Sequence, residues 1–305
     1  MSIAELKQIS LKDSDKVISI LKKTNNRSFW ACFPVLYSFL NHSSRKTYLI
    51  QDKIVCERRW PWGIDFRILF KKDEGDNKLI EGLITHNPAY IGYTFMHEKA
   101  FPDKRWMNID EFEYDLQKIY SMEGSGFKNL RNSYTHIARK YPSISTRTID
   151  DFSTDKILKF FNQWKAEKNT PLAHIDSDIT LITNFLNKGA LGTILELDGD
   201  IVGIEISYPH TSSDNYCVNA IRKVLPSFKQ GTEFLQVEHA KRCINAGFLT
   251  ANDGSKGSPA QKSFKERLHN NLLPMIPIFA QAAYYDKASL PEDKSFIYSF
   301  ATAGE

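Results

Sequence analysis

Residues 191–248, LGTILELDGDIVGIEISYPHTSSDNYCVNAIRKVLPSFKQGTEFLQVEHAKRCINAGF, carry most of the information about the fold. Two runs that alternate apolar and polar residues flank Asp198-Gly199, which is the strongest short-range signal of a β-hairpin. A third strand is expected around residues 215–219, and a helix then begins at Gly231. A helix that begins at a glycine soon after a strand has backbone N–H groups available for an anionic or carbonyl ligand. This layout suggests group transfer from a phosphate-bearing donor.

The composition is that of an ordinary globular protein. The 305 residues are 42% hydrophobic, 25% charged and 12% aromatic, and the net charge of +4 does not by itself indicate a nucleic-acid or membrane protein. The sequence shows neither the apolar core of a signal peptide nor an 18-residue apolar run, so we expect no spanning helix. We therefore expect a cytoplasmic protein.

Cysteine and histidine spacing argues against a metal site or a disulfide framework. Cys32, Cys56, Cys217 and Cys243 lie far apart and form no C-x-x-C motif, so reduced thiols are expected. The histidines His136, His174 and His210 have no acidic or cysteine partner at metal-ligand spacing, and we expect no metal.

The first half of the chain mixes helices and strands. Helices are expected from Ser14 or Asp15 and over residues 29–40, and a short helix over residues 79–85. Strands are expected over residues 47–56, 64–70 and 91–96.

An amphipathic helix with a basic outer face is expected over about residues 124–141. Lys128, Arg131 and Arg139 lie on that face, and no acidic residue occurs between Glu123 and Asp150. One interpretation is a solvated face whose charges are neutralised by acids elsewhere. The other is a contact with phosphates or with a tRNA backbone.

The second half begins near Arg147. Helices are expected over residues 155–167 and 179–186, before the hairpin, and a further helix follows Ser258. Short strands are expected over residues 248–252, 275–283 and 296–300. We expect two domains, 1–145 ending in the basic linking helix and 146–305 carrying the transfer site.

The order helix, helix, hairpin, strand, glycine-started helix, strand resembles the GCN5-related N-acetyltransferase (GNAT) fold, and residues 195–203 look like its second and third strands. More specifically, the chain resembles the soluble C-terminal domain family of bacterial phosphatidylglycerol lysyltransferases over roughly residues 20–285. The residues that carry this resemblance are Gly126-Phe127-Lys128-Asn129-Leu130-Arg131-Asn132 with Tyr141-Pro142, then Gly231, Asn252-Asp253-Gly254 and the basic helix from Gln261 to Pro274. The resemblance implies an α+β fold of tandem GNAT-like domains, each a mixed sheet flanked by helices in three layers.

The activity that the resemblance implies is transfer of an aminoacyl group from aminoacyl-tRNA to a lipid, peptide or small-molecule acceptor. The lysyltransferases carry a multi-span membrane segment before this domain and the sequence shows none, so the amine or hydroxyl of a soluble acceptor is expected. An acyl-CoA-dependent N-acyltransferase is the alternative, although the loop at Ser227–Thr232 has one glycine where such enzymes usually have two. Because the loop has only one glycine, we expect Gly231 to form one wall of an acyl-transfer cleft rather than a phosphate-binding turn. A third alternative is a non-catalytic GNAT-like binding module. No tightly bound cofactor is expected, because the donor would be aminoacyl-tRNA or acyl-CoA.

Direct acyl transfer requires a group that deprotonates the nucleophile and donors that stabilise the oxyanion. The catalytic candidates are Glu205 and Glu233 as general base and Tyr216 as a donor to the leaving group; each also has a plain structural interpretation. The candidates for substrate binding are Asp214, Asn215, Asn219, Gly231, Thr232, Asn252 and Asp253. The resemblance implies that Asn252 and Asp253 contact the ammonium of the aminoacyl group, although as turn residues they need no further reason. The candidates for binding the donor's phosphates or tRNA are Lys128, Arg131, Arg139, Lys229, Lys262, Lys265 and Arg267.

Overall fold

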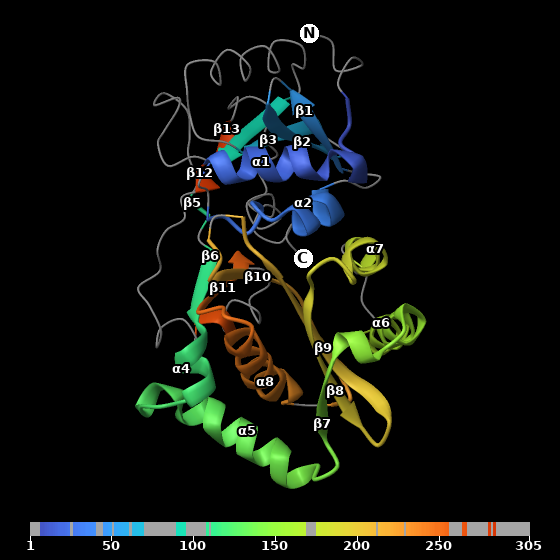
Figure 1. The fold of residues 1–305 in the computed structure, drawn as a ribbon, viewed down its shortest axis with the longest axis vertical. Coiled ribbons are helices and arrows are strands. Elements are labelled where there is room, and N and C mark those ends of the chain that lie inside the picture. Colours follow the sequence, from blue (N-terminus) through green and yellow to red (C-terminus); the bar gives the residue numbers. More distant parts are fainter. Residues whose placement is uncertain are drawn as a thin grey trace. The chain divides into compact units, whose positions relative to one another are not determined.

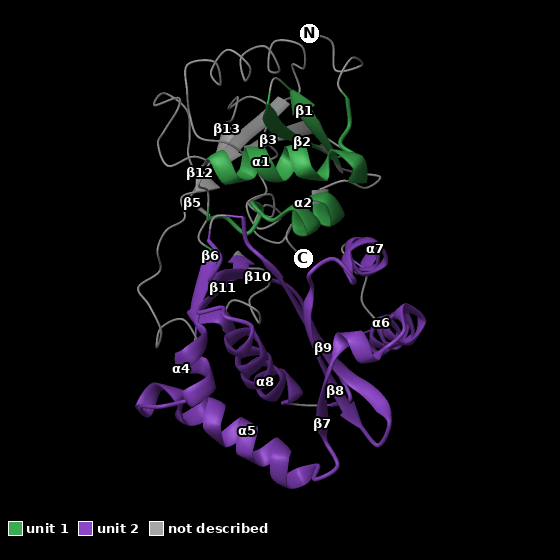
Figure 2. Ribbon diagram, viewed as in Figure 1, with its two compact units in different colours: residues 1–111, 255–258, 276–304 green, residues 112–254, 259–275, 305 purple. Residues whose placement is uncertain are grey.

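The computed structural model describes residues 7–24, 27–40, 45–50, 52–60, 63–69, 90–95, 108–109, 111–168, 175–211, 213–228, 230–255, 264–266, 280–281 and 283–284. The chain forms two compact units, shown in Figure 2. Unit 1 comprises Met1–Glu111, Ser255–Ser258 and Ile276–Gly304, and unit 2 comprises Phe112–Gly254 and Pro259–Met275 with the last residue. Each unit combines a mixed sheet with flanking helices, which confirms the predicted α+β class.

Unit 1 is built on a five-stranded sheet in the order β1-β2-β3-β4-β13. Its elements are α1 (Ser14–Thr24), α2 (Phe33–Leu40), β1 (Arg45–Ile50), β2 (Lys53–Trp60), β3 (Gly63–Leu69), β4 (Tyr90–Phe95) and β13 (Ala283–Tyr284), with the separate pair β5 (Asn108–Ile109) and β12 (Ala280–Gln281). The pair β3 and β4 is parallel and the others are antiparallel. The apolar faces of α1 and α2 are buried, as the side chains of Val17, Leu21 and Leu36 show.

The strand expected over residues 47–56 is confirmed only in part. These residues form a hairpin of two strands, because Asp52 adopts a left-handed conformation (φ 61°) between β1 and β2. An aspartate tolerates that conformation better than most residues, so no glycine is needed at this turn. The alternation of apolar and polar residues runs on through the turn and therefore does not reveal it. The predicted helix over residues 79–85 lies outside the described residues, as do most of the strands expected after residue 275.

Unit 2 is built on a six-stranded sheet in the order β6-β11-β10-β9-β8-β7. Its strands are β6 (Glu111–Asp115), β7 (Ser145–Thr148), β8 (Leu191–Leu197), β9 (Asp200–Pro209), β10 (Tyr216–Val224) and β11 (Thr250–Ser255). Its helices are α4 (Leu116–Ser121), α5 (Lys128–Lys140), α6 (Thr154–Lys168), α7 (Ile175–Phe185) and α8 (Gly231–Asn245). The predicted hairpin is confirmed: Asp198 and Gly199 both have positive φ (53° and 90°), as a tight two-residue turn between β8 and β9 requires.

Helix α8 covers one face of this sheet, and α6 and α7 lie on the other side (Figure 1). Helices α4 and α5 pack beside α8, and their core includes Phe112 and Tyr114 of β6 with Val237 and Ala240 of α8. The glycine-started helix therefore lies at the centre of unit 2. In the described part of the chain, none of the helices has both the length and the apolar character needed to cross a bilayer.

Helix α5 belongs to unit 2, whereas we expected it to end a first domain at residue 145. Its inner residues Leu130 and Ile137 are buried, and the Tyr134 ring stacks on Phe234 of α8 with centroids 4.7 Å apart. The Tyr134 hydroxyl also donates to Glu238 of α8 at 2.6 Å. These contacts join α5 to α8, and the boundary between the compact units accordingly falls at Glu111/Phe112.

Candidate active site

The centre of the candidate site is the place where β10 and β11 stop pairing. The two parallel strands are paired only from Tyr216↔Thr250 to Val218↔Asn252. Beyond that point β10 continues alongside β9, and its register shifts between Asn219 and Ile221. A register shift of this kind re-aims side chains and is common next to active sites. Four polar side chains from three strands meet here: Glu205 of β9, Asn219 and Arg222 of β10, and Asp253 of β11.

Glu205 is completely buried, and its two carboxylate oxygens have different surroundings. Oε1 accepts hydrogen bonds from Asn219 Nδ2 at 2.6 Å and from Arg222 Nε and Nη2 at 2.9 and 2.7 Å. Oε2 has no hydrogen-bond partner among the residues that the structure describes. Because buried polar atoms are almost always paired, Oε2 is an acceptor whose partner the described residues do not supply.

Asp253 closes the other side of the cluster. Its Oδ2 accepts from Arg222 Nη1 at 3.2 Å and from the Tyr114 hydroxyl at 3.0 Å, and Lys265 Nζ lies 3.8 Å away. The side chains of Arg222, Asp253 and Lys265 are 10%, 7% and 14% exposed, so the cluster reaches solvent on this side. Burial and the neighbouring Asp253 carboxylate raise the pKa of Tyr114, which keeps its proton. Burial alone would lower the pKa of Arg222, but the carboxylates of Asp253 and Glu205 raise it further, so the guanidinium stays charged.

A second row of buried groups connects the cluster to α8. Ser207 Oγ donates to Asn219 Oδ1 at 3.1 Å and lies 2.8 Å from His239 Nε2, while His239 Nδ1 lies 2.9 Å from Thr193 Oγ1. Cys243 Sγ is 3.4 Å from the same His239 Nε2. Hydrogen bonding from the Cys217 thiol, together with His239, lowers the pKa of Cys243 to about 5 against the effect of burial. Burial lowers the pKa of His239, but the Cys243 and Glu205 charges outweigh it and raise the pKa overall.

The sequence-predicted residues divide between this cluster and other places. The structure brings Glu205, Asn219, Asp253 and Lys265 together. Tyr216 is buried, and its hydroxyl donates to Glu113. Glu233 and Thr232 are half-buried in the first turn of α8.

Two predicted substrate residues have local structural roles, and a third is exposed. Asn252 Oδ1 accepts the Gly254 amide at 2.8 Å, which stabilises the turn after β11. Asn215 lies in the exposed loop before β10; its carbonyl accepts the Leu249 amide at 2.8 Å and its side chain accepts the Ser213 hydroxyl at 2.6 Å. Asp214, in the same loop, is exposed.

Gly231 is required by packing. A Cβ atom there would lie 2.3 Å from Phe228 Cδ1 and 2.9 Å from Val224 Cγ1, so no larger residue fits without movement. Its amide donates to the Phe228 carbonyl at 3.3 Å, although we expected it to face a ligand. The Gly231 amide at the start of α8 is therefore used by the loop that precedes the helix.

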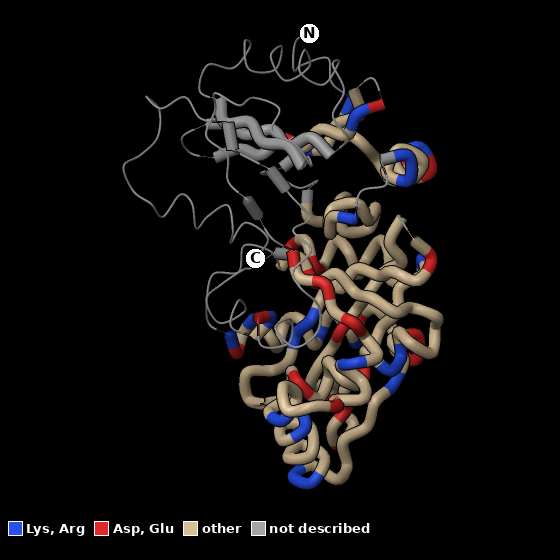
Figure 3. Tube along the Cα trace, turned by 90° about the vertical axis from the view of Figure 1, so that its left-hand side faces the viewer, with Lys and Arg blue, Asp and Glu red and all other residues tan. Residues whose placement is uncertain are grey.

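The basic face of α5 is only partly available for phosphates. Lys128 and Arg139 are exposed, and within the described ranges no acidic side chain forms an ion pair with either; Figure 3 shows blue residues gathered along this helix at the foot of unit 2. Arg131 instead donates to the carbonyls of Met122 and Gly124 and fixes the loop before the helix. Lys229, Lys262 and Arg267 lie outside the described residues.

Sequence reasoning missed Arg222, Tyr114, Ser207 and His239. Arg222 stands beside Lys223 in the second half of β10, and two neighbouring charged residues gave no sign that one of them is buried. His239 and Cys243 are four residues apart on the inner face of α8, a spacing that places them side by side. Tyr114 and Ser207 gave no signal, because their partners are remote in sequence.

Neither a protein-family model nor a curated protein sequence matches this chain. Solved structures do match. A conserved protein of unknown function from Bacteroides thetaiotaomicron has a TM-score of 0.73 at 17% identity, over 92% of this chain and 99% of that one. This chain shares its fold. L-PGS from Bacillus licheniformis follows with a TM-score of 0.63 at 14% identity over the whole of both chains. The C-terminal domain of a putative lysylphosphatidylglycerol synthetase from Agrobacterium fabrum has a TM-score of 0.60 at 13% identity, over 91% of this chain and 92% of that one. The predicted resemblance to the lysyltransferase C-terminal domain is confirmed at the level of the fold.

Proposed function

We propose that this protein is an acyltransferase of the GNAT superfamily that transfers an aminoacyl group from aminoacyl-tRNA to the amine or hydroxyl of a soluble acceptor. The observation that carries the proposal is Glu205: a buried carboxylate with one oxygen held by Asn219 and Arg222 and the other without a partner in the described part of the chain. It lies where two parallel strands diverge, in a fold shared with L-PGS.

In this proposal Glu205 moves the proton. Its Oε2 accepts the proton of the acceptor amine or hydroxyl as that group attacks the ester carbonyl of the donor. The tetrahedral intermediate then collapses, the ester bond to the ribose oxygen breaks, and Glu205 returns the proton to that oxygen. The Tyr216 hydroxyl donates its hydrogen bond to Glu113, so we assign the return of the proton to Glu205 rather than to Tyr216.

Arg222 and Asp253 position this base. Arg222 holds Oε1 of Glu205 with two nitrogens and Asp253 with the third, which fixes the position of Oε1. Asp253 lies on the side of the cluster that reaches solvent, but Arg222 and Lys265 already neutralise its carboxylate, so we assign Asp253 to holding Arg222.

Two observations favour tRNA over coenzyme A as the donor. Lys128 and Arg139 present exposed charges on α5 that no described acid neutralises, which suits a phosphate backbone. The Gly231 amide is used by Phe228, and the packed side chains of Phe228 and Val224 fill the space beside it, which argues against a pyrophosphate at this turn.

The test is protein-dependent discharge of a labelled donor. The protein is incubated with radiolabelled aminoacyl-tRNA pools and, separately, with acyl-CoAs, each with a mixture of amino acids, polyamines and short peptides as acceptors. We expect discharge of aminoacyl-tRNA, reduced about 10²- to 10⁴-fold in Glu205→Gln. Asp155→Asn, which makes the same carboxylate-to-amide change at an exposed residue of α6, is the matched control and should keep full activity. Discharge of coenzyme A thioesters alone would refute the tRNA donor, and discharge of neither would refute acyl transfer.

A further inference from the structure

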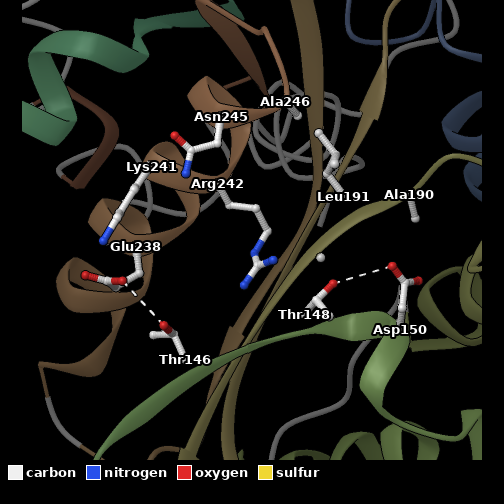
Figure 4. Close-up of a pocket in the computed structure, with 11 residues that line it drawn as sticks. Thr146, Thr148, Asp150, Ala190, Leu191, Glu238, Lys241, Arg242, Asn245 and Ala246 are labelled. Carbon is white, nitrogen blue, oxygen red and sulfur yellow. Dashed lines mark hydrogen bonds between the residues drawn. The ribbon is translucent and has the colours of Figure 1, made fainter.

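A pocket separate from the Glu205 cluster lies between the C-terminal half of α8 and the start of β8 beside β7 (Figure 4). Its volume is about 460 Å³, within the range of small-molecule sites. One wall carries Glu238, Lys241 and Arg242 of α8, and the opposite wall carries Thr148 of β7 and Asp150 of the short 3₁₀ turn Ile149–Asp151. Leu191 and two alanines supply apolar surface.

Arg242 directs its charge into this pocket. Its Nε donates to Thr193 Oγ1 at 3.0 Å, which fixes the side chain, and Figure 4 shows the guanidinium in the middle of the pocket. No described acidic residue forms an ion pair with its two terminal amino groups, which form the fork that binds a carboxylate with two hydrogen bonds.

The acidic side chains of the pocket are not equivalent. Glu238 is held by the Tyr134 hydroxyl at 2.6 Å and lies 3.5 Å from Thr146 Oγ1, so it serves the contact between α5 and α8. Asp150 accepts only a long bond of 3.4 Å from its neighbour Thr148 among the described residues. Asp150 and Arg242 therefore face one cavity from opposite walls without pairing (Figure 4).

We propose that this pocket binds a small zwitterion of amino-acid size, with its carboxylate on Arg242 and its ammonium on Asp150. Opposite charges held apart across a cavity are complementary to a ligand that carries both, whereas a simple anion or a simple cation would satisfy only one of them. The alanines and Leu191 leave room for a short aliphatic side chain on the ligand.

The pocket is connected to the candidate active site through buried hydrogen bonds. Arg242 holds Thr193, Thr193 contacts His239, and His239 contacts Ser207, which bonds to Asn219 beside Glu205. The inference does not rest on the proposed transfer reaction, since binding is measured on the chain alone without a donor.

The test is isothermal titration calorimetry of the full chain with glycine, L-alanine and L-lysine as probes. Acetate and methylammonium, which carry one end of the zwitterion each, are titrated at the same concentrations. We expect saturable binding of at least one amino acid, about tenfold or more tighter than binding of either single-charge compound.

Four variants decide where binding occurs. Arg242→Met and Asp150→Asn should each weaken it by about tenfold or more, and Ala190→Phe should block it by filling the pocket while keeping both charges. Ala190→Phe leaves the hydrogen bond between Arg242 and Thr193 in place, so it tests the pocket even if Arg242→Met disturbs Thr193. Circular dichroism checks that each variant is folded. Lys165→Met with Asp155→Asn on α6, across the sheet, is the matched control and should bind as the parent does. Absence of binding by every probe, equal binding of acetate and the amino acids, or unchanged binding in both Arg242→Met and Ala190→Phe overturns the proposal.

Discussion

Breaking the ion pair between Glu205 and Arg222 should destabilise unit 2, because it leaves a buried charge with one partner fewer, and Glu205→Gln tests this. The substitution keeps the shape of the side chain but removes the charge; the amide oxygen can keep the Oε1 position held by Asn219 and Arg222, and the NH₂ then takes the Oε2 position, which has no described partner. Glu205 is fully buried and the Arg222 side chain is 10% exposed, so water cannot replace the lost partner.

The expected cost follows from this burial. Removing one partner of a buried pair costs about 3–5 kcal/mol, and because Arg222 keeps Asp253 as a second partner we expect about 3 kcal/mol. For a domain of about 150–250 residues this corresponds to a fall in melting temperature of about 6–12 °C.

The assay is urea unfolding of four proteins: the parent, Glu205→Gln, Arg222→Met and the double variant. Hydrogen exchange at the amides of β9 and β10 assigns the change to unit 2. The double variant removes both charges, so it should be about 2–3 kcal/mol more stable than the sum of the single effects predicts. A coupling energy below about 0.5 kcal/mol would contradict this expectation, because it would mean that the two side chains are independent in solution.

Three further predictions concern the parts around this cluster. Gly231→Ala should cost about 1–3 kcal/mol in urea unfolding, because the new methyl group overlaps Phe228; Thr232→Ala next to it is the control and should cost less. Lys128→Gln combined with Arg139→Gln should weaken tRNA binding in filter assays and make that binding less dependent on salt concentration. Arg131→Gln should chiefly lower stability, because Arg131 binds backbone carbonyls. An unchanged salt dependence in the double variant would count against the α5 surface as a tRNA contact. The Cys243 thiolate should titrate near pH 5 in ultraviolet absorbance, and that transition should be missing in Cys243→Ala. Because the pKa of Cys243 is depressed in the folded protein, its contribution to stability is fully present above the unfolded pKa near 9 and is lost as pH falls toward 5. An absorbance titration that is identical in the parent and in Cys243→Ala would refute the assignment.

Local chemistry was enough to predict much of unit 2. The Asp198-Gly199 turn, the apolar stripes of α5 and α6 and the start of α8 at Gly231 all depend on residues close together in the chain, and the order of these elements carried the resemblance to the lysyltransferase domain. Glu205, Asn219 and Asp253 were recognised as candidates one at a time, because polar residues in or beside strands are conspicuous.

The three-dimensional fold determines which of these residues belong together. Arg222 reaches Glu205 and Asp253 only because β10 pairs antiparallel with β9 and briefly parallel with β11, and that register depends on strands far apart in sequence. The role of Gly231 also changed, from a ligand contact to a packing requirement, because the position of Phe228 is set by the fold of the loop. Turns and periodicity act over a few residues, so the amino-acid order alone specifies the elements. The partners of the buried charges come from the fold, since electrostatic pairing depends on distance in space rather than along the chain.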